Sequence, residues 1–327
     1  MIIFILARLL QAIPVLLVVG VIAFAMFAYV GDPVAAMLGQ DYTVADRAAL
    51  LHKLGLDRPA YVQFAHYIWG ALHGNFGYSY RVAEPVSQLF ATRLPATLEL
   101  SFTSSVLAVL VGIPLGVYAG IWRKSFLSRS VMVGSLLGVS LPTFLIGILL
   151  ILVFSVELGW LPSFGRGRVV ELGWWSTGFL TWSGLRALIL PAITLGLFQL
   201  TLIMRLVRAE MLEVLRSDYI KFARARGLRS RAINFGHALK NTLVPVITVI
   251  GLQLGGVIAY SVVTETVFQW PGMGLLFIQS VASADIPVMA AYLLLVGVVF
   301  VVINLVVDLL YYAVDPRLRI ERGGRGR

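Results

Sequence analysis

The chain of 327 residues contains no cysteine and little charge. Without cysteine, disulfide cross-links and thiolate chemistry are excluded, whereas the compartment stays open because membrane proteins anywhere can lack this residue. Only 13% of the residues are charged, about half of what soluble domains carry. Hydrophobic residues make up 59% of the chain and its mean hydropathy is +0.90. This composition indicates an integral membrane protein.

Enzyme motifs are also lacking. No G-x-x-x-x-G-K-[ST] phosphate-binding loop occurs, since the only Lys-Ser pair, Lys124-Ser125, follows Arg123 in place of glycine. There is no H-E-x-x-H zinc motif, and residues 77–81 only half resemble a nucleophile elbow. Neither a catalytic centre nor a bound cofactor is expected in this chain.

Histidine is scarce, and three of the four histidines, His52, His66 and His73, lie between residues 31 and 96. A metal site for a nickel cargo is one interpretation of this grouping. Their spacing matches no recognised ligand motif, so solvated surface histidines are the favoured interpretation and no metal site is expected.

Long apolar runs predict six transmembrane helices, because a helix crosses the hydrocarbon core in about 20 residues. The runs cover about 9–30, 97–121, 131–156, 187–209, 243–263 and 291–313. The first run is too long for a typical signal peptide and no clean A-x-A cleavage site follows it, so it is expected to be retained. The predicted fold class is all-α integral membrane.

The connections between these runs divide the chain further. A first helix (1–30) precedes an insert (31–96), in which the segment VADRAALLHKLG has helical periodicity. A core of five helices (97–313) contains a basic loop (210–242), and a basic tail (314–327) follows.

The distribution of Lys and Arg predicts the orientation. With the N-terminus in the cytoplasm, 18 of the 26 basic residues fall on the inner side, as the positive-inside rule requires. Both termini then face the cytoplasm and the 31–96 insert faces outward. The net charge of +10 therefore reflects basic residues that set the orientation and contact lipid headgroups, and no nucleic-acid partner is expected.

The basic loop has an amphipathic pattern that a glycine interrupts. On a helix through 211–223, one face is apolar: Met211, Leu212, Leu215, Tyr219, Phe222 and Ala223. Gly227 is a natural helix stop. A second short helix is expected from Ser230 as its N-cap, with Ala232, Phe235 and Leu239 along one side. The residues leave open whether this is a basic loop at an anionic leaflet or a docking element for a cytoplasmic partner.

Small and aromatic residues mark the fifth run and the loop after it. Gly251, Gly255 and Gly256 allow close approach of another helix, either for ordinary packing or for a gate. Trp270 lies in the Gly/Pro-rich loop that follows. It is interpreted as an interfacial anchor in preference to part of an outer gate.

Asp308 lies in the apolar last run, where an acid is costly and suggests a function. It is only about five residues, or 7–8 Å, from the predicted inner end. A structural pairing with Arg205 or Arg208 is therefore preferred to a substrate role.

The basic loop resembles the cytoplasmic "EAA" loop of ABC importer membrane subunits, in the form found in the dipeptide/oligopeptide/nickel family. The similar stretches are Asp218-Tyr219, Ala223–Leu228, His237–Asn241 and Pro245. Lys221 stands where the broader pattern has Glu, and the glycine-to-proline spacing is longer; both departures are typical of the peptide branch.

Further motifs extend the resemblance over nearly the whole chain. They are Arg8–Pro14, Gly31–Pro33, Leu54–Pro59, Gly74–Ser79, Arg93–Thr97, Glu157–Pro162, Glu265–Gly272, Asp308–Tyr311 and Asp315–Arg317. Asn75 departs mildly, since the family has Asp at that place. Several ordered motifs are far more specific than any one of them.

The resemblance implies the first, B-type permease subunit, with the six-helix type I fold, of a binding-protein-dependent importer in the bacterial inner membrane. The implied partners are a second homologous permease, two cytoplasmic ATPase subunits that bind ATP and Mg, an external solute-binding protein and membrane lipid. Ala223, Ala225, Gly227 and Leu228 would couple this chain to one ATPase. The implied cargo is di- or oligopeptides, with nickel complexes, glutathione or oligosaccharides as alternatives.

Two other classes of function fit the sequence less well. A membrane-embedded enzyme with the 31–96 insert as a lid needs clustered titratable groups near the membrane surface, whereas the acids here are dispersed. A stand-alone channel or secondary transporter needs no coupling glycine, and no internal repeat is apparent.

Overall fold

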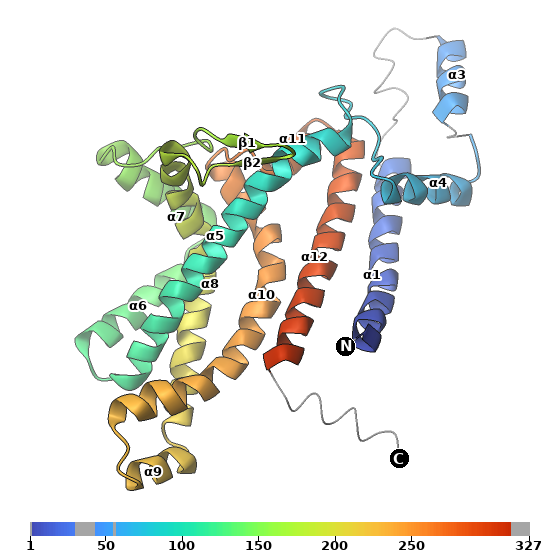
Figure 1. Cartoon of the computed structure of the whole chain (residues 1–327). Helices are drawn as coiled ribbons and strands as arrows, with labels where there is room; N and C mark the ends of the chain where they lie inside the picture. The colour runs from blue at the N-terminus through green and yellow to red at the C-terminus, as the bar shows by residue number, and fades with distance from the viewer. Residues whose placement is uncertain (1, 30–42, 55–56, 315–327) are drawn as a thin grey trace, which may run out of the picture. The chain divides into compact units, whose positions relative to one another are not determined.

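The computed structural model describes residues 2–29, 43–54 and 57–314 (Figure 1). They fall into two compact units. The first unit is drawn from residues within 1–97, 170–177 and 271–302. The second is drawn from residues within 98–169, 178–270 and 303–327. Each unit is described by itself.

The first unit is mainly helical. Its elements are α1 (Ile2–Tyr29), α3 (Val44–Leu54), α4 (Ala60–Leu72), the start of α5 (Val86–Ile121), β1 (Val170–Leu172), β2 (Trp175–Thr177), α11 (Met273–Ala282) and most of α12 (Ile286–Val314). The predicted helix in the insert is confirmed as α3. It begins with a capping box, in which the Thr43 backbone N–H donates to Asp46 Oδ2 (3.0 Å) and the Asp46 N–H donates to Thr43 Oγ1 (3.2 Å).

The hairpin of β1 and β2 departs from the all-α expectation. The strands are antiparallel, with Leu172 opposite Trp175 and Val170 opposite Thr177. Gly173 has a φ of 69° at the first position of the two-residue turn, which is where hairpin turns of type II′ place a glycine. Three-residue strands are too short for a periodic signal in the sequence.

Asp285 organises a loop of the first unit. Its carboxylate is buried and accepts hydrogen bonds from the Ser79 hydroxyl and from the backbone N–H groups of Tyr80 (3.1 Å) and Arg81 (3.4 Å). The Ser79 hydroxyl also accepts from the Val82 N–H at 3.1 Å. Ser79, at the half-formed elbow motif, therefore holds a loop in shape.

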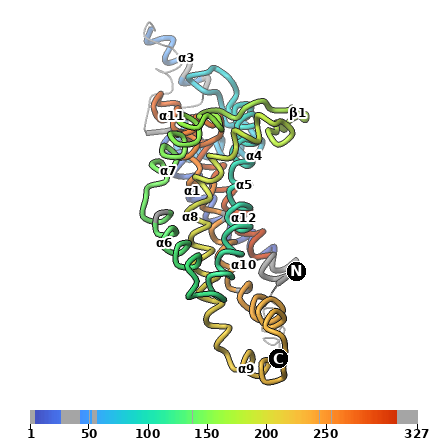
Figure 2. Tube along the Cα trace, turned by 90° about the vertical axis from the view of Figure 1, so that its left-hand side faces the viewer, coloured from blue at the N-terminus to red at the C-terminus, as the bar shows by residue number. Residues whose placement is uncertain are grey.

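The second unit holds the remaining helices. They are the rest of α5, α6 (Phe126–Ser140), α7 (Thr143–Leu150), the π-helix η1 (Ile151–Glu157), α8 (Trp182–Val214), α9 (Asp218–Ala225), the π-helix η2 (Ala232–Ala238), α10 (Leu239–Val267) and the end of α12. In both views, α9 lies at the end of α8 and α10 that is opposite α7 (Figures 1 and 2).

A buried ion pair fixes the segment before α8 to α5. Arg166 Nη2 lies 2.6 Å from Glu99 Oε2, and the two side chains are 6% and 2% exposed. The Gly178 N–H donates to both carboxylate oxygens, at 3.2 and 3.3 Å. Burial of a charge is costly unless it is paired and hydrogen-bonded, and here both conditions are met.

Within residues 2–29, 43–54 and 57–314, four helices are long and apolar enough to cross a membrane, and the number rises to six if each of two bent pairs forms one span. The predicted run at 131–156 is such a pair, bent by 113° between Phe126–Ser140 and Thr143–Glu157. Pro142 explains this break, because proline disfavours helical conformation in the residue before it. The second pair bends by 46° before Pro245. The run predicted from 97 begins earlier, since α5 starts at Val86.

Candidate coupling loop and central pocket

The basic loop begins with a break that the sequence did not reveal. α8 ends at Val214, and hydrogen bonds of a turn follow, from the Arg216 N–H to Glu213 O (3.0 Å) and from the Ser217 N–H to Val214 O (3.1 Å). The Ser217 hydroxyl also donates to Val214 O at 2.6 Å. The continuous helix predicted through 211–223 is therefore wrong. Serine hydrogen-bonds nearby backbone groups and so favours a helix boundary.

The break changes which residues of α9 are buried. Ile220 and Ala223 are buried, whereas Tyr219 and Phe222 are 41% and 64% exposed. Of the predicted apolar face, only Ala223 in α9 therefore lies in the core. Because the turn interrupts the 100° periodicity, the face of α9 cannot be extrapolated from α8.

The second short helix shows the same kind of difference. Ile233 and Ala238 are buried on η2, whereas Ala232 and Phe235 are exposed. Since η2 is a π-helix, its residues do not repeat with the period assumed for an α-helix. The Ile233 N–H bonds to Arg229 O at 3.1 Å, so Ser230 lies inside the first turn and not at the predicted N-cap.

Gly227 ends α9 as predicted. Its φ is 76°, which favours glycine. The Gly227 N–H donates to Arg224 O (2.9 Å) and the Leu228 N–H to Ala223 O (3.3 Å). These two bonds form a Schellman motif, with Gly227 at the left-handed position. Ala225, Gly227 and Leu228 lie exposed at this turn.

Polar contacts hold α9 against the start of α10. Asn241 Nδ2 donates to Tyr219 Oη at 2.6 Å, and the Tyr219 hydroxyl donates to His237 O at 3.5 Å. Tyr219 therefore ties the two short helices together through its polar end. All three residues lie in the stretches that carry the resemblance to the "EAA" loop.

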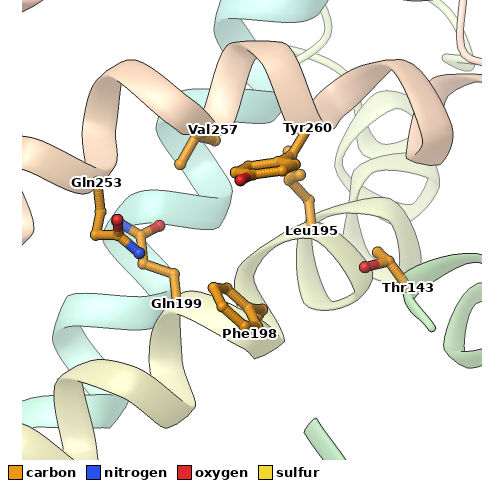
Figure 3. A pocket seen from close by; sticks show the side chains of 7 residues that line it. All are labelled: Thr143, Leu195, Phe198, Gln199, Gln253, Val257 and Tyr260. Atoms are coloured by element: carbon orange, nitrogen blue, oxygen red, sulfur yellow. The ribbon is translucent and has the colours of Figure 1, made fainter. Parts of the chain in front are cut away.

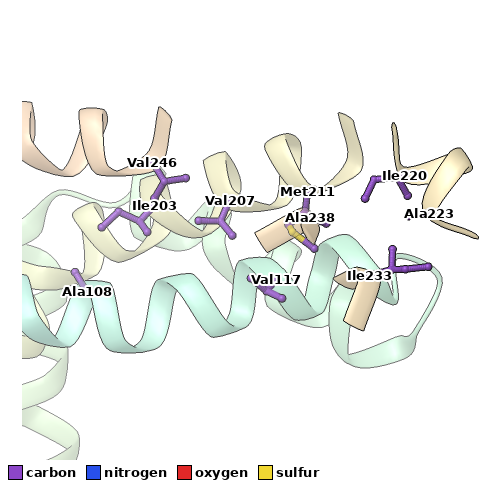
Figure 4. Packing of buried hydrophobic residues seen from close by; sticks show 10 residues of the cluster. All are labelled: Ala108, Val117, Ile203, Val207, Met211, Ile220, Ala223, Ile233, Ala238 and Val246. Carbon is purple, nitrogen blue, oxygen red and sulfur yellow. The ribbon is translucent and has the colours of Figure 1, made fainter. Parts of the chain in front are cut away.

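A single buried cluster joins the loop to the long helices (Figure 4). Its members are Ala108 and Val117 from α5, Ile203, Val207 and Met211 from α8, Ile220 and Ala223 from α9, Ile233 and Ala238 from η2, and Val246 from α10. Close-packed cores transmit displacement and do not absorb it. A force on the exposed turn at Gly227 would therefore reach α5, α8 and α10 together.

Glycines of α5 let that helix pack closely on α8, a feature that the sequence analysis missed. A Cβ at Gly116 would lie 2.6 Å from Met204 O, and one at Gly120 would lie 2.7 Å from Met211 Cβ. With Gly112, these residues form a small-xxx-small series. The signal was therefore present in the sequence as a repeated four-residue spacing.

The glycines singled out on α10 differ from one another. A Cβ at Gly251 would collide with Val307 of α12, so this residue serves close helix packing. Among the described residues, a Cβ at Gly256 would meet only Tyr260 of its own helix. For Gly255, a packing or gating role stays a prediction.

Trp270 and Asp308 lie in different environments. Trp270 is only 1% exposed, so its ring is not available at a lipid surface and the interfacial-anchor interpretation is wrong. Asp308 is half-buried near the end of α12. Its pairing with Arg205 or Arg208 stays a prediction.

The three histidines of the insert lie in different surroundings. His52 Nδ1 lies 2.7 Å from Asp57 Oδ2, and this hydrogen bond lowers the pKa of the Asp57 carboxyl. His73 Nδ1 lies 2.8 Å from Trp69 O, and His66 is exposed. These contacts tie His52 and His73 to different neighbours.

A pocket of about 300 Å³ opens between α7, α8 and α10. It is lined by Thr143, Leu195, Phe198, Gln199, Gln253, Val257 and Tyr260. Figure 3 shows these side chains around one space, with Gln199 and Phe198 projecting from α8 and Gln253 and Tyr260 from α10. None of these residues carries a signal in the sequence, because each is unremarkable within its own apolar run.

Comparison with known proteins places the chain in a family. Residues 112–320 match the family described as "Binding-protein-dependent transport system inner membrane component", and residues 1–101 match its N-terminal counterpart. The chain is 42% identical to the "Di/tripeptide transport system permease protein DppB" of Pseudomonas aeruginosa, over 98% of this chain and 99% of that protein. It is 40% identical to the "Glutathione transport system permease protein GsiC" of Salmonella typhi, over 97% and 99%.

Solved structures show the same fold. A chain of the inward-facing MetNI methionine ABC transporter superposes with a TM-score of 0.54 at 21% identity, covering 69% of this chain and 96% of that one. Together with the matches over the whole length, this shows that the chain is a multi-pass inner-membrane protein of the binding-protein-dependent transport family, a permease of its dipeptide/oligopeptide ABC importer branch.

Proposed function

We propose that this permease forms half of the translocation pathway of an ATP-driven importer of di- and oligopeptides. The observation that carries the proposal is the loop from Leu215 to Asn241. Its exposed turn at Gly227 is joined by one buried cluster to α5, α8 and α10. Relatives named for di/tripeptide and glutathione transport support a peptide cargo, since glutathione is itself a modified tripeptide.

The exposed part of the loop has the chemistry of a docking surface. Phe222, Leu228 and Phe235 are 64%, 41% and 46% exposed, and Arg226 lies over the Phe222 ring at 5.8 Å. Aromatic and Arg side chains are enriched where proteins bind one another. In the proposed complex, this surface seats on one cytoplasmic ATPase subunit.

Coupling then follows from packing. The ATPase subunits bind ATP and Mg, and their closure would push the turn at Gly227. Because Ile220 and Ile233 are buried in the same cluster as Met211 of α8, α9 and η2 would pass the movement on to the long helices. Tilting of α8 and α10 would open the pathway outward, as a rigid-body switch. No ATPase site is needed in this chain.

The remaining partners follow from the same proposal. A second homologous permease would complete the pathway, and an external solute-binding protein would deliver the cargo. The basic loop and both termini would face the cytoplasm, in keeping with the positive-inside distribution. The insert would face outward.

The proposal is tested by gentle extraction of the tagged chain from its native host, followed by native mass spectrometry. We expect one homologous permease and two ATPase subunits in the same complex. Deletion of the gene should also abolish ATP-dependent uptake of di- and tripeptides. Recovery of the chain alone, or as a homo-oligomer without an ATPase, would refute the coupling role of the loop.

A further inference from the structure

The pocket between α7, α8 and α10 lies halfway along two long helices. Gln253 is the central residue of α10, and Gln199 lies within a few residues of the centre of α8. If these helices span the bilayer, both amides lie near its middle. Polar side chains at that depth are expensive and are functional-site candidates by default.

Gln199 is the unusual member of this pair. Its side chain is buried, with the residue 3% exposed. Neither its amide nitrogen nor its amide oxygen has a hydrogen-bond partner among the residues that the structure describes. An unpaired buried amide destabilises a protein, so a partner outside the described chain is expected. The pocket is where that partner has room, because its volume equals that of about ten waters at roughly 30 Å³ each.

The lining limits the chemistry of the ligand. None of its seven residues is charged, so this lining suits an uncharged segment of a ligand, such as the interior of a peptide, and not its charged ends. Gln199, Gln253, Thr143 and Tyr260 supply neutral hydrogen-bonding groups, and Phe198 and Tyr260 supply aromatic rings. A primary amide offers one donor side and one acceptor side. In an extended peptide, the N–H and the C=O of one residue point to the same side and match both.

Two aromatic residues of the lining are accessible. Tyr260 is 68% exposed and Phe198 is 41% exposed, whereas Gln199 is buried. A ligand beside these two aromatic side chains would also lie beside the unpaired amide, because all three residues line the same pocket. Specificity from a few polar groups in a mainly apolar pocket is the usual design of small-molecule sites.

We propose that this pocket binds the backbone of the transported peptide, with the Gln199 amide pairing with the N–H and C=O of one residue and Phe198 and Tyr260 contacting the peptide's side chains. The inference rests on the proposed function, and it adds a cargo site within this chain. Recognition of the backbone, and not of particular side chains, suits an importer that accepts peptides of varied sequence.

The test compares two cargoes in the complete importer, reconstituted in proteoliposomes with its permease partner, ATPases and binding protein. The probes are Ala-Ala-Ala and its analogue with one amide replaced by an ester, which lacks an N–H donor. The measurement is the ratio of kcat/KM for the amide over the ester. The amount of active complex affects both values of kcat/KM equally, so a lower yield of folded complex in a variant leaves the ratio unchanged.

In Gln199→Met, which keeps the side chain's length but not its hydrogen bonds, we expect the ratio to fall by about threefold to tenfold from wild type, the value of one neutral hydrogen bond. Gln88→Met, the same change at an exposed position of α5, should leave it unchanged. Discrimination by the binding protein is common to all variants and also cancels.

An unchanged ratio in Gln199→Met would overturn the proposal, because water or lipid alone would then be satisfying the amide. If the wild-type complex moves neither peptide, the proposed function itself fails and the cargo site fails with it. The two failures are therefore distinguishable.

Discussion

The buried pair of Glu99 and Arg166 allows a quantitative prediction. Two guanidinium nitrogens lie 2.6 and 3.2 Å from the same carboxylate oxygen, and among the residues that the structure describes the other donor to this carboxylate is the Gly178 N–H. In Arg166→Met, the carboxylate would be left buried with that single donor. Removal of one partner of a buried pair typically costs about 3–5 kcal/mol.

The cost should appear as local opening of the segment that Arg166 anchors. About 4 kcal/mol corresponds to a roughly thousandfold increase in the opened population. Arg168 is exposed in this segment, so trypsin cleavage after Arg168, followed by mass spectrometry of the purified protein, reports the opened population when closing is fast.

Two controls separate loss of an ion pair from loss of an arginine. The Arg186 guanidinium donates to the Trp160 carbonyl, a neutral and more exposed contact, so Arg186→Met should cost only about 1 kcal/mol. The double variant Glu99→Gln/Arg166→Met leaves no buried charge and should regain much of the loss. Two results would contradict this prediction. One is trypsin cleavage of Arg166→Met that is no faster than cleavage of Arg186→Met. The other is cleavage of the double variant that is as fast as cleavage of Arg166→Met.

Two glycine substitutions test the coupling path. Gly227→Val forces a β-branched residue to a φ of 76°, at a cost of about 1–2 kcal/mol. We expect this variant to lose transport, whereas its membrane insertion and the ATP hydrolysis of the complex should persist. The matched control is Gly236→Val, where a Cβ meets no described atom within 4 Å and no left-handed φ is required. Equal transport in both variants would exclude the coupling role of the turn at Gly227. Gly116→Leu should force α5 away from α8, since its Cβ would lie 2.6 Å from Met204 O, and overpacking typically costs about 1–3 kcal/mol. The abundance of the Gly116→Leu subunit on a membrane blot should fall. Gly134→Leu is the control, because a Cβ there meets nothing within 4 Å in the described part of the chain, and its abundance should not change. Similar abundance of the two variants would mean that α5 and α8 adjust to the larger side chain.

Residues with local signals were predictable from the sequence. The helix stop at Gly227 depends on backbone conformation within a few residues, and the chain itself supplies the hydrogen bonds of the Schellman motif. The helix α3 likewise carries its own cap and periodicity. Long apolar runs determine a membrane protein before any packing is known, because the bilayer selects them by length.

Other features depended on tertiary structure. The turn at Ser217 changes which face of α9 meets the core, so Ile220 is buried and Phe222 is exposed. Glu99 and Arg166 are 67 residues apart, and nothing local to either residue predicts their contact. Gln199 looks like any polar residue in an apolar helix until the described part of the fold shows that its side chain is buried there without a hydrogen bond. The sequence by itself therefore determined the membrane class, the family and the local stops, whereas the fold alone decided the ion pair, the buried face and the pocket, because these depend on which distant side chains the packing brings together.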